Sequence, residues 1–513
     1  MGLNIVRRIR DNLHGSIDVS ELEDAVMAHP FFQRLRRVRQ LAFLHYVFPG
    51  ATHTRFEHSM GVMHLAARAW EKLQTNQERL RHTVSNIQDF KAFEEAADKA
   101  EKHGRLWPTF AMMDQIFQSD YSLQTFRLAA LLHDVGHPAF SHSGEHFMPS
   151  WVDVREANTD LPDYLLEYID NRIAEIKSRG DDPKVVKVRH EIYSILLIDK
   201  ILKGVYEKNP QLRLIVDPRD VIAMINPAIQ PAAGSPLLSS QTSHVLRELI
   251  SGELDIDRMD YLLRDSRECG VVYGVFDVDR ILDSLGLYFD DEDQQIHVAI
   301  HLSGLAAFED YLRARYSMYL QLYFHKSAVA AEAMMRHLCN TLGDWRLPAK
   351  IENYAAIDEY NIGNALWEAA KKLPTPLQEE TIVLVADLLY NRKLWKRIYE
   401  VTAPRNKPVV DGLEKVKALL TANKITFQEI SSENSLTRFQ PKGGGARSRN
   451  YLRLIKKDEQ QLHRICAIED YSSLIASNDS VAIRRIYASP DQTHSLTEIK
   501  AVITEGMQKP KVK

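Results

Sequence analysis

The chain has few cysteines, no long apolar run and no strong excess of charge of either sign. Its three cysteines, Cys269, Cys339 and Cys466, lie far apart, which excludes a disulfide framework and a zinc knuckle. No run reaches the ~18 apolar residues of a membrane helix, and no apolar segment follows the basic N-terminus as in a signal peptide. We therefore expect a cytoplasmic protein without a membrane partner. The net charge of −4 means that nucleic-acid binding would depend on local basic patches.

The composition is that of an ordinary globular protein, with 45% apolar and 26% charged residues. A length of 513 residues favours about three domains. Apolar residues recur at helical spacing in many segments, for example at 62–73, which predicts a mainly α fold. Two apolar runs around an acidic turn at 287–300 predict a β-hairpin.

Changes in composition along the chain suggest a division into parts. The composition shifts after about residue 425, where several strand-favouring segments appear, which predicts a small α+β subdomain there. The glycine run at 441–447 lacks the Lys-Ser/Thr of a phosphate loop, so we interpret it as a surface loop. The expected parts are a core at 1–330 with a polar helical insertion at 74–125, a helical extension at 331–425, the α+β subdomain at 426–506, and a basic tail at 507–513.

The strongest chemical signal is a window of four histidines at 133–146. An even distribution of the 20 histidines would put about 0.5 in a window of this length. An apolar helical run ends at His133 and Asp134, and Gly136 and Pro138 then break the helix. Because a buried imidazole needs a polar partner, this density favours metal binding or acid–base chemistry over core packing.

Two further segments carry residues suited to complete a metal site. His58 stands near the start of a predicted helix, and Asp257 lies among four acids in the eight residues 253–260. Taken singly, His58 also fits an ordinary helix start and Asp257 a solvated acidic face. Together with His133 and Asp134 they would form a set of two imidazoles and two carboxylates that leaves coordination positions open for water and substrate.

These segments resemble the HD superfamily of metal-dependent phosphohydrolases, whose pattern is H…HD…D. Residues 32–62, the stretch Asp-Ile-Asp-Arg-Met-Asp-Tyr at 255–261 and the segment 315–326 are similar to the deoxynucleoside triphosphate triphosphohydrolase branch. The resemblance covers about residues 7–345. It implies a mainly α protein, with an HD-domain helical core followed by the small α+β C-terminal subdomain.

The resemblance also implies roles for individual residues. His58, His133, Asp134 and Asp257 would hold one divalent ion, which would be Mn, Fe, Zn or Mg, with additional Mg bound to the nucleotide phosphates. His142 would be the catalytic histidine, oriented by Glu145 where the family usually has Asp, and His137 and His190 would face the phosphates. The implied substrate-binding residues are Gln40, Leu41, Arg55, Arg258, Tyr261, Asp265, Arg315, Tyr319 and Tyr323; Phe324 departs from the family pattern.

The implied reaction converts a dNTP and water to a deoxynucleoside and tripolyphosphate. A tyrosine under C2′ would exclude ribonucleotides by steric rejection. Two alternatives are a 5′-deoxynucleotidase and a catalytically silent nucleotide or nucleic-acid sensor. Alarmone hydrolases are disfavoured because Gly136-His137-Pro138 stands where they carry a Glu-Asp pair.

Regulation by a second nucleotide is a further implication. Arg7, Asp11, Gln33 and Arg36 match parts of a site that, in the family, binds an activating nucleotide at the interface of a homo-oligomer, a tetramer or hexamer. Ala28 replaces the acid that reads guanine there. The arginine cluster at 34–39 would bind an activating nucleotide or single-stranded DNA, and it fits a solvated helix face equally well.

Overall fold

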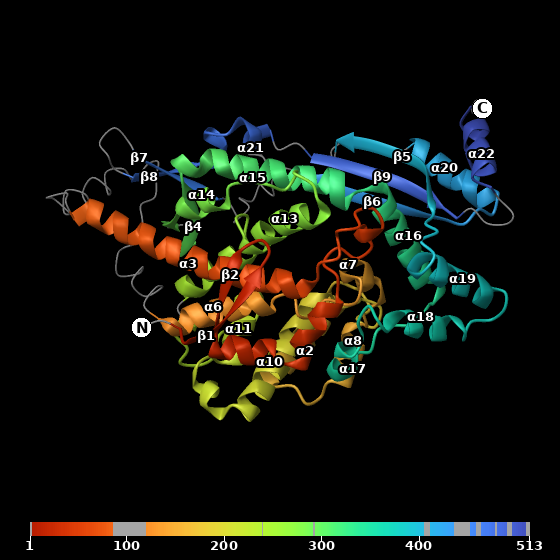
Figure 1. Ribbon diagram of the computed structural model, residues 1–513. Coiled ribbons are helices and arrows are strands. Elements are labelled where there is room, and N and C mark those ends of the chain that lie inside the picture. Colours follow the sequence, from red (N-terminus) through yellow and green to blue (C-terminus); the bar gives the residue numbers. More distant parts are fainter. Residues whose placement is uncertain are drawn as a thin grey trace.

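The fold is mainly α-helical with a C-terminal α+β part, as the sequence predicts (Figure 1). The computed structural model describes residues 3–85, 119–238, 240–290, 293–404, 411–435, 452–457, 463–477, 480–489 and 495–508. Most of the insertion expected at 74–125, the glycine run at 441–447 and most of the expected basic tail therefore lie outside the described residues.

The chain begins with an antiparallel hairpin, β1 (Ile5–Asp11) and β2 (Gly15–Ser20). Helix α1 (Glu21–Met27) follows directly, started by a capping box in which Ser20 and Glu23 satisfy each other's backbone amides. Next come α2 (Pro30–Gln33) and 3₁₀ turns at Arg34–Arg37 and Leu44–Tyr46.

Four helices form the centre of the molecule and carry most of the candidate site. They are α3 (Arg55–Ser85), α6 (Asp120–Leu132), α10 (His190–Lys208) and α13 (Ile256–Cys269). The apolar stripe predicted at 62–73 is buried on α3, and α6 is buried over most of its length. A Cβ atom at Gly61 would lie 1.9 Å from Asp260 Oδ1, so glycine is needed where α3 approaches α13.

The remaining elements surround these helices and extend the core. A π-helical turn, Tyr319–Tyr323, separates α15 from α16. Short 3₁₀ turns lie at Glu145–Phe147, Pro210–Leu214, Pro236–Leu238, Leu302–Gly304 and Ile468–Asp470. The other helices are α7 (Ser141–Gly144), α8 (Trp151–Ala157), α9 (Asp163–Ser178), α11 (Pro218–Ile225), α12 (Ser240–Ser251), α14 (Val278–Asp283), α15 (Leu305–Met318), α16 (Lys326–Thr341), α17 (Ile351–Ala355), α18 (Ile362–Ala370), α19 (Leu377–Leu389), α20 (Asp411–Ala422), α21 (Ser473–Ser477) and α22 (Leu496–Gln508).

A four-stranded sheet, in the order β3-β4-β7-β8, contains the predicted hairpin. β3 (Leu285–Asp290) and β4 (Gln295–His301) are antiparallel, with Leu287 opposite Val298, which confirms the prediction for 287–300. β7 (Arg453–Lys457) adds to β4 in parallel, and β8 (His463–Ala467) pairs antiparallel with β7.

The second C-terminal sheet, in the order β5-β9-β6, lies toward the opposite end of α15 (Figure 1). It consists of β5 (Lys396–Pro404), β6 (Phe427–Ser435) and β9 (Ser480–Ala488). β5 lies inside the segment 331–425 that we expected to be helical. Both β5 and β6 pair with β9, which comes later in the chain. On β9, Arg485 Nη1 donates to the carbonyl of Phe324 (2.5 Å), and the Tyr487 hydroxyl donates to that of Lys326 (2.8 Å).

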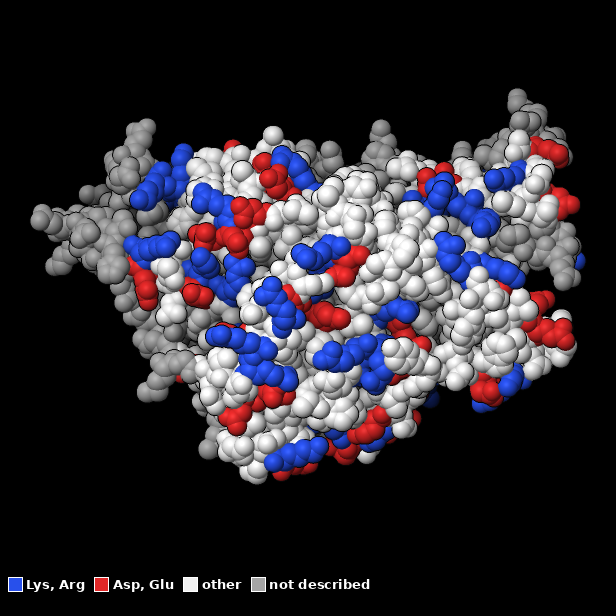
Figure 2. Space-filling model, viewed as in Figure 1, with Lys and Arg blue, Asp and Glu red and all other residues white. Residues whose placement is uncertain are grey.

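The surface carries both signs of charge. On the face drawn in Figure 2, lysine and arginine are interspersed with aspartate and glutamate. None of the helices in the described part of the chain combines the length and apolarity needed to cross a bilayer.

Candidate metal and phosphate site

The four residues expected to bind a metal come together from three helices. His58 lies in the first turn of α3, His133 and Asp134 follow the end of α6, and Asp257 lies in the first turn of α13. Nε2 of His58 is 3.0 Å from Asp257 Oδ1 and 3.5 Å from Asp134 Oδ2. Nε2 of His133 is 3.5 Å from an oxygen of each carboxylate. The structure therefore brings the two imidazole nitrogens and an oxygen of Asp257 to one point, with Asp134 facing each imidazole through a different oxygen.

Hydrogen bonds on the far side of each imidazole fix which nitrogen faces this point. Nδ1 of His58 donates to Asp260 Oδ2 (2.8 Å), and Nδ1 of His133 donates to the carbonyl of Ala130 (2.8 Å). Both Nε2 atoms are buried and lack a hydrogen-bond partner within the described residues. Such a lone pair, supported from behind and facing a carboxylate, fits a divalent cation.

The same carboxylates alter the acid–base properties of the site. Burial alone would lower the pKa of the His58 imidazole, but the carboxylates of Asp257 and Asp260 raise it to about 10. The pKa of His133 is raised by Asp134 and Asp257, again against the effect of burial. Without a cation, the His58 imidazole therefore holds a proton at neutral pH, which a bound cation would replace.

Asp260 is the centre of the support behind His58. It is fully buried and also accepts hydrogen bonds from His14 Nε2 (2.6 Å) and from Nε and Nη2 of Arg264 (2.9 Å each). Arg264 in turn donates to Asp11 (2.9 Å). This network ties the turn of the first hairpin to α13 and holds the orientation of His58.

Arg55 contacts the metal-ligand set directly. The sequence resemblance placed its guanidinium on the triphosphate, whereas here it is buried, with Nη1 on Asp134 and Nε donating to Ser141 Oγ (2.9 Å). Burial would raise the pKa of Asp134, but Arg55 and the neighbouring histidines keep it well below its usual range. Arg55 therefore keeps this carboxylate ionised and ready to bind a cation.

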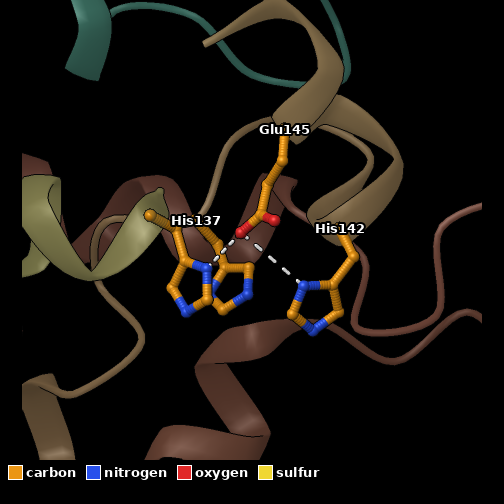
Figure 3. A group of neighbouring side chains, drawn as sticks. His137, His142 and Glu145 are labelled. Atoms are coloured by element: carbon orange, nitrogen blue, oxygen red, sulfur yellow. Dashed lines mark hydrogen bonds and ion pairs between the residues drawn. The ribbon is translucent and has the colours of Figure 1, made fainter. Parts of the chain in front are cut away.

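A second cluster stands beside the first and contains His137, His142, Glu145 and His190. Figure 3 shows the Glu145 carboxylate between the ring of His142 and the paired rings at His137. Glu145 accepts from Nδ1 of His190 and lies 3.7 Å from Nδ1 of His142. The rings of His137 and His190 stack with centroids 3.5 Å apart. The glutamate therefore lies near His142, as the sequence suggested, and also binds His190, which the sequence had assigned to the phosphates.

The members of this cluster differ in exposure. The side chain of His142 is 72% exposed, whereas His137 is buried. Burial and the Arg55 charge lower the pKa of His137 far below its usual value, so this ring is neutral. The two histidines lower the pKa of Glu145 against the effect of its burial. An ionised carboxylate thus stands behind a solvent-facing imidazole, an arrangement suited to proton transfer.

The turn that presents His142 has a strained backbone. Phe140 and Ser141 have φ values of 63° and 50°, a region that costs non-glycine residues about 1–3 kcal/mol each. Ser141 Oγ donates to the carbonyl of Arg39 (2.6 Å), and this bond helps to hold the turn in place.

An aromatic and acidic wall lies between α13 and the π-helical turn. The rings of Tyr261 and Tyr323 are 6.2 Å apart, and Tyr319 packs 5.0 Å from Tyr323. Asp265 accepts from the Tyr323 hydroxyl (2.7 Å) and from Nε2 of His53 (2.8 Å). The sequence resemblance assigned Asp265 to a sugar hydroxyl; its two oxygens are already fixed in orientation by these donors.

Gln40 and Leu41, two further predicted residues, lie near His53, whose carbonyl accepts from the backbone amide of Gln40 (3.1 Å). The side-chain oxygen of Gln40 is buried without a hydrogen-bond partner among the described residues. Leu41 is half-buried against the apolar core. A buried amide oxygen without a donor suggests that a polar ligand completes this place.

The other two arginines expected on the phosphates, Arg258 and Arg315, differ in how completely their guanidinium groups are bonded. Arg258 is paired with Asp255 (3.3 Å) and donates to the carbonyl of Glu253 (3.3 Å). Arg315 is 6% exposed, yet its Nε and Nη1 atoms have no hydrogen-bond partner in the described chain, and the nearest carboxylate oxygen, of Glu253, is 3.8 Å away. A buried guanidinium left so incompletely bonded favours an anionic ligand.

The residues expected at a regulatory site have separate partners, and they differ in whether they are buried or exposed. Arg7 is half exposed and pairs with Asp24 (2.5 Å), while Asp11 is buried under Arg264 and caps the turn at His14. Gln33 donates to the carbonyl of Met27 (2.7 Å) and accepts from Arg36 Nε (2.9 Å). The assignment of Asp11 to a nucleotide is therefore at odds with its internal position.

In the basic cluster at 34–39, Arg34 is buried, Arg36 is exposed, and Arg37 and Arg39 are partly exposed. Arg34 is 1% exposed and donates to the carbonyl of His137 (2.8 Å). Arg37 pairs with Asp358 (2.5 Å) and Arg39 with Glu359 (3.0 Å). Arg34 therefore belongs neither to a solvated helix face nor to a nucleic-acid patch. It is buried and donates to a backbone carbonyl in the loop that contains the histidine window.

Sequence reasoning missed the residues that support the site. Asp260 was present in the acidic stretch but was given no role, although its spacing of three from Asp257 places both on one side of α13. His14 and His53 had no recognisable signal, because their partners lie more than 200 residues away. Arg264 did have one, since it stands four residues after Asp260 on the same helix.

Comparisons with known proteins show which families the sequence and the fold resemble. The family model described as "HD associated region" matches residues 276–431. A phosphohydrolase from Bacteroides thetaiotaomicron has a similar structure, with a TM-score of 0.58 and 21% identity, covering 94% of this chain and 99% of that one. This likeness establishes the fold alone.

Curated relatives match at about one quarter identity. An uncharacterized protein of Methanocaldococcus jannaschii is 26% identical over 328 residues, 64% of this chain and 48% of the relative. Human deoxynucleoside triphosphate triphosphohydrolase SAMHD1 is 25% identical over 346 residues, 65% of this chain and 44% of that protein. The chain spans about half the length of the curated relatives it matches. Together, these findings show that the chain is similar in sequence to HD-domain proteins and similar in fold to a phosphohydrolase.

Proposed function

We propose that this protein hydrolyses deoxynucleoside triphosphates to a deoxynucleoside and tripolyphosphate. The observation that carries the proposal is the pair of buried, unpartnered Nε2 atoms of His58 and His133 facing Asp134 and Asp257. The likeness to the human triphosphohydrolase supports the choice of substrate.

The four residues His58, His133, Asp134 and Asp257 would hold one divalent ion, Mn, Fe, Zn or Mg. A bound ion of this kind polarises a phosphate oxygen and lowers the pKa of its water far below the ~15.7 of bulk water. Asp260 keeps Nδ1 of His58 protonated, so that Nε2 remains a ligand.

Arginines provide the binding of the triphosphate. Arg315 has free donor atoms in a buried position and would bind a phosphate oxygen at little further desolvation cost. Arg258 would act from its ion pair with Asp255, while Arg55 remains on Asp134 and contributes its charge from there.

His142 is assigned proton delivery to the 5′-oxygen of the departing deoxynucleoside. Water attacks the α-phosphorus, the bond from phosphorus to the 5′-oxygen breaks, and the imidazolium proton passes to that oxygen. Glu145 stabilises the charged ring, and the neutral His137 adds no repulsion against it. His190, also bonded to Glu145, completes this pair.

The aromatic wall would select the sugar. The rings of Tyr261 and Tyr323 would lie against C2′ and leave no room for a 2′-hydroxyl. Asp265, oriented by His53 and Tyr323, would accept the 3′-hydroxyl, with Gln40 as a second partner and Leu41 against the deoxyribose.

The test is product analysis by anion-exchange chromatography after incubation with each dNTP and Mn²⁺ or Mg²⁺, with and without GTP. The expected products are deoxynucleoside and tripolyphosphate, absent in the double variant His133→Ala/Asp134→Ala. A requirement for GTP, together with a change in oligomer size on a sizing column, would support an activating nucleotide. Phosphate release from a deoxynucleoside monophosphate with dNTPs untouched would replace the proposal by a nucleotidase, and no turnover by a sensor.

A further inference from the structure

A third group of ligand-type side chains lies between α12 and the β3–β4 hairpin. It is separate from the candidate metal site of His58, His133, Asp134 and Asp257, which we call the HD site. The third group contains His244 and Glu248, one turn apart on α12, and His297 in the middle of β4. His244 Nε2 is 3.1 Å from His297 Nδ1 and 3.2 Å from Glu248 Oε1, and His297 Nδ1 is 2.6 Å from the same oxygen. Three potential ligand atoms thus converge from two elements.

Neighbouring groups orient these atoms toward one another. The backbone amide of Val298 donates to Glu248 Oε2 (2.7 Å), which turns Oε1 toward the imidazoles. Nε2 of His297 donates to Asp293 Oδ2 (3.0 Å). In a neutral ring this bond leaves the Nδ1 lone pair facing the Glu248 oxygen. The two lone pairs repel unless a proton or a cation lies between them, and a carboxylate behind an imidazole is the usual support of a metal-bound histidine.

We propose that His244 Nε2, Glu248 Oε1 and His297 Nδ1 bind a zinc-type transition-metal ion, with Asp293 as the supporting carboxylate. Metal–ligand bonds of 2.0–2.1 Å in a tetrahedral site put ligand atoms ~3.3 Å apart, close to two of the three observed spacings. Two imidazoles and one carboxylate suit Zn²⁺ or Co²⁺ better than Mg²⁺ or Ca²⁺.

The exposure of the cluster fits an ion with an open fourth position. The side chain of His297 is 7% exposed, whereas those of His244 and Glu248 are 30% and 22% exposed. Water would complete the coordination from the open side.

Such an ion would fasten α12 to β4. α12 ends at Ser251, and the chain then leads through Asp255 into α13, the helix that carries Asp257. The ion would therefore fix the approach to the HD site without contacting substrate. This proposal does not depend on which reaction the HD site performs.

The experiment is a Co²⁺ titration of the full chain carrying His133→Ala/Asp134→Ala, which disables the HD site. The expected result is one Co²⁺ per chain, with the strong visible absorption of a tetrahedral ion. Glu248→Gln, added to this chain, keeps the acceptor for Val298 but removes the charged ligand, and should abolish the signal. Asp293→Asn should weaken binding by ~10–100-fold. His301→Gln, on the same strand but outside the cluster, should change nothing.

A second measurement covers failure of the double variant to fold. Elemental analysis of the otherwise unaltered protein loaded with Zn²⁺ should give two ions per chain, falling to one in Glu248→Gln. The proposal is overturned if Glu248→Gln leaves the metal stoichiometry and the Co²⁺ spectrum unchanged. It is also overturned if the double variant binds no Co²⁺ and the otherwise unaltered protein binds only one Zn²⁺. The cluster would then be an imidazolium–carboxylate network that joins α12 to the hairpin.

Discussion

Replacement of Asp260 by Asn should weaken the HD metal site without touching any of its ligands. Asp260 is fully buried and accepts hydrogen bonds from His58, His14 and Arg264. An amide can accept from some of these donors but brings no charge, so the Arg264 cation loses its main partner. Removing one member of a buried ion pair costs about 3–5 kcal/mol of folding stability. Without the Asp260 carboxylate, the His58 ring is no longer held with Nδ1 protonated and Nε2 toward the metal. Metal binding should therefore weaken by ~10–100-fold.

The assay is Mn²⁺ affinity and thermal unfolding of Asp260→Asn, both in the Glu248→Gln background so that only the HD site is titrated. Asp279→Asn is the matched control, because that carboxylate is 69% exposed and pairs with Arg68 at the surface. The control should keep both its affinity and its unfolding temperature. Unchanged Mn²⁺ affinity in a folded Asp260→Asn protein would refute the claim that Asp260 orients His58.

Three other predictions concern substrate binding and pH. Arg315→Met should lower kcat/KM for dNTPs by roughly 100-fold, since charged hydrogen bonds contribute about 1.5–3 kcal/mol each, and should not lower the unfolding temperature; an unaltered kcat/KM would remove Arg315 from the phosphate site. Tyr323→Phe should raise KM by about tenfold with a smaller effect on kcat, because Asp265 loses one of its two orienting donors; a fall confined to kcat would contradict this. Burial, helped by the charge of His14, lowers the pKa of His64 to about 4. Because the unfolded chain binds this proton at 6.5, stability is complete above pH 6.5 and falls by up to roughly 3 kcal/mol toward pH 4. Urea unfolding of His64→Gln between pH 4 and 7 should show a correspondingly flatter dependence, and identical curves would argue against it.

Features formed by residues that are close in the chain could be predicted from local sequence patterns. The hairpin at 287–300 follows from alternation around an acidic turn, and the burial of 62–73 follows from helical spacing. The gathering of His58, His133, Asp134 and Asp257 was expected from their chemistry and from a family resemblance.

The features that escaped sequence analysis depend on distant partners. β5 forms because β9, about 80 residues later, pairs along its length, and its own sequence carries no decisive alternation. His14 and Arg264 find Asp260 and Asp11 only once the first hairpin lies on α13. Arg34 was interpreted with its exposed neighbours, but Ile357 and His137 supply carbonyls that draw it inside. Such choices belong to tertiary packing, which a local window does not contain.

The bonds from β9 to the end of the π-helical turn set an order of events during synthesis. Arg485 and Tyr487 hold the carbonyls of Phe324 and Lys326, next to the aromatic wall of the site. A ribosome must therefore have released β9 before this wall has its final support. The nascent protein should lack that support until β9 is inserted, so the wall beside the site should become ordered late during synthesis.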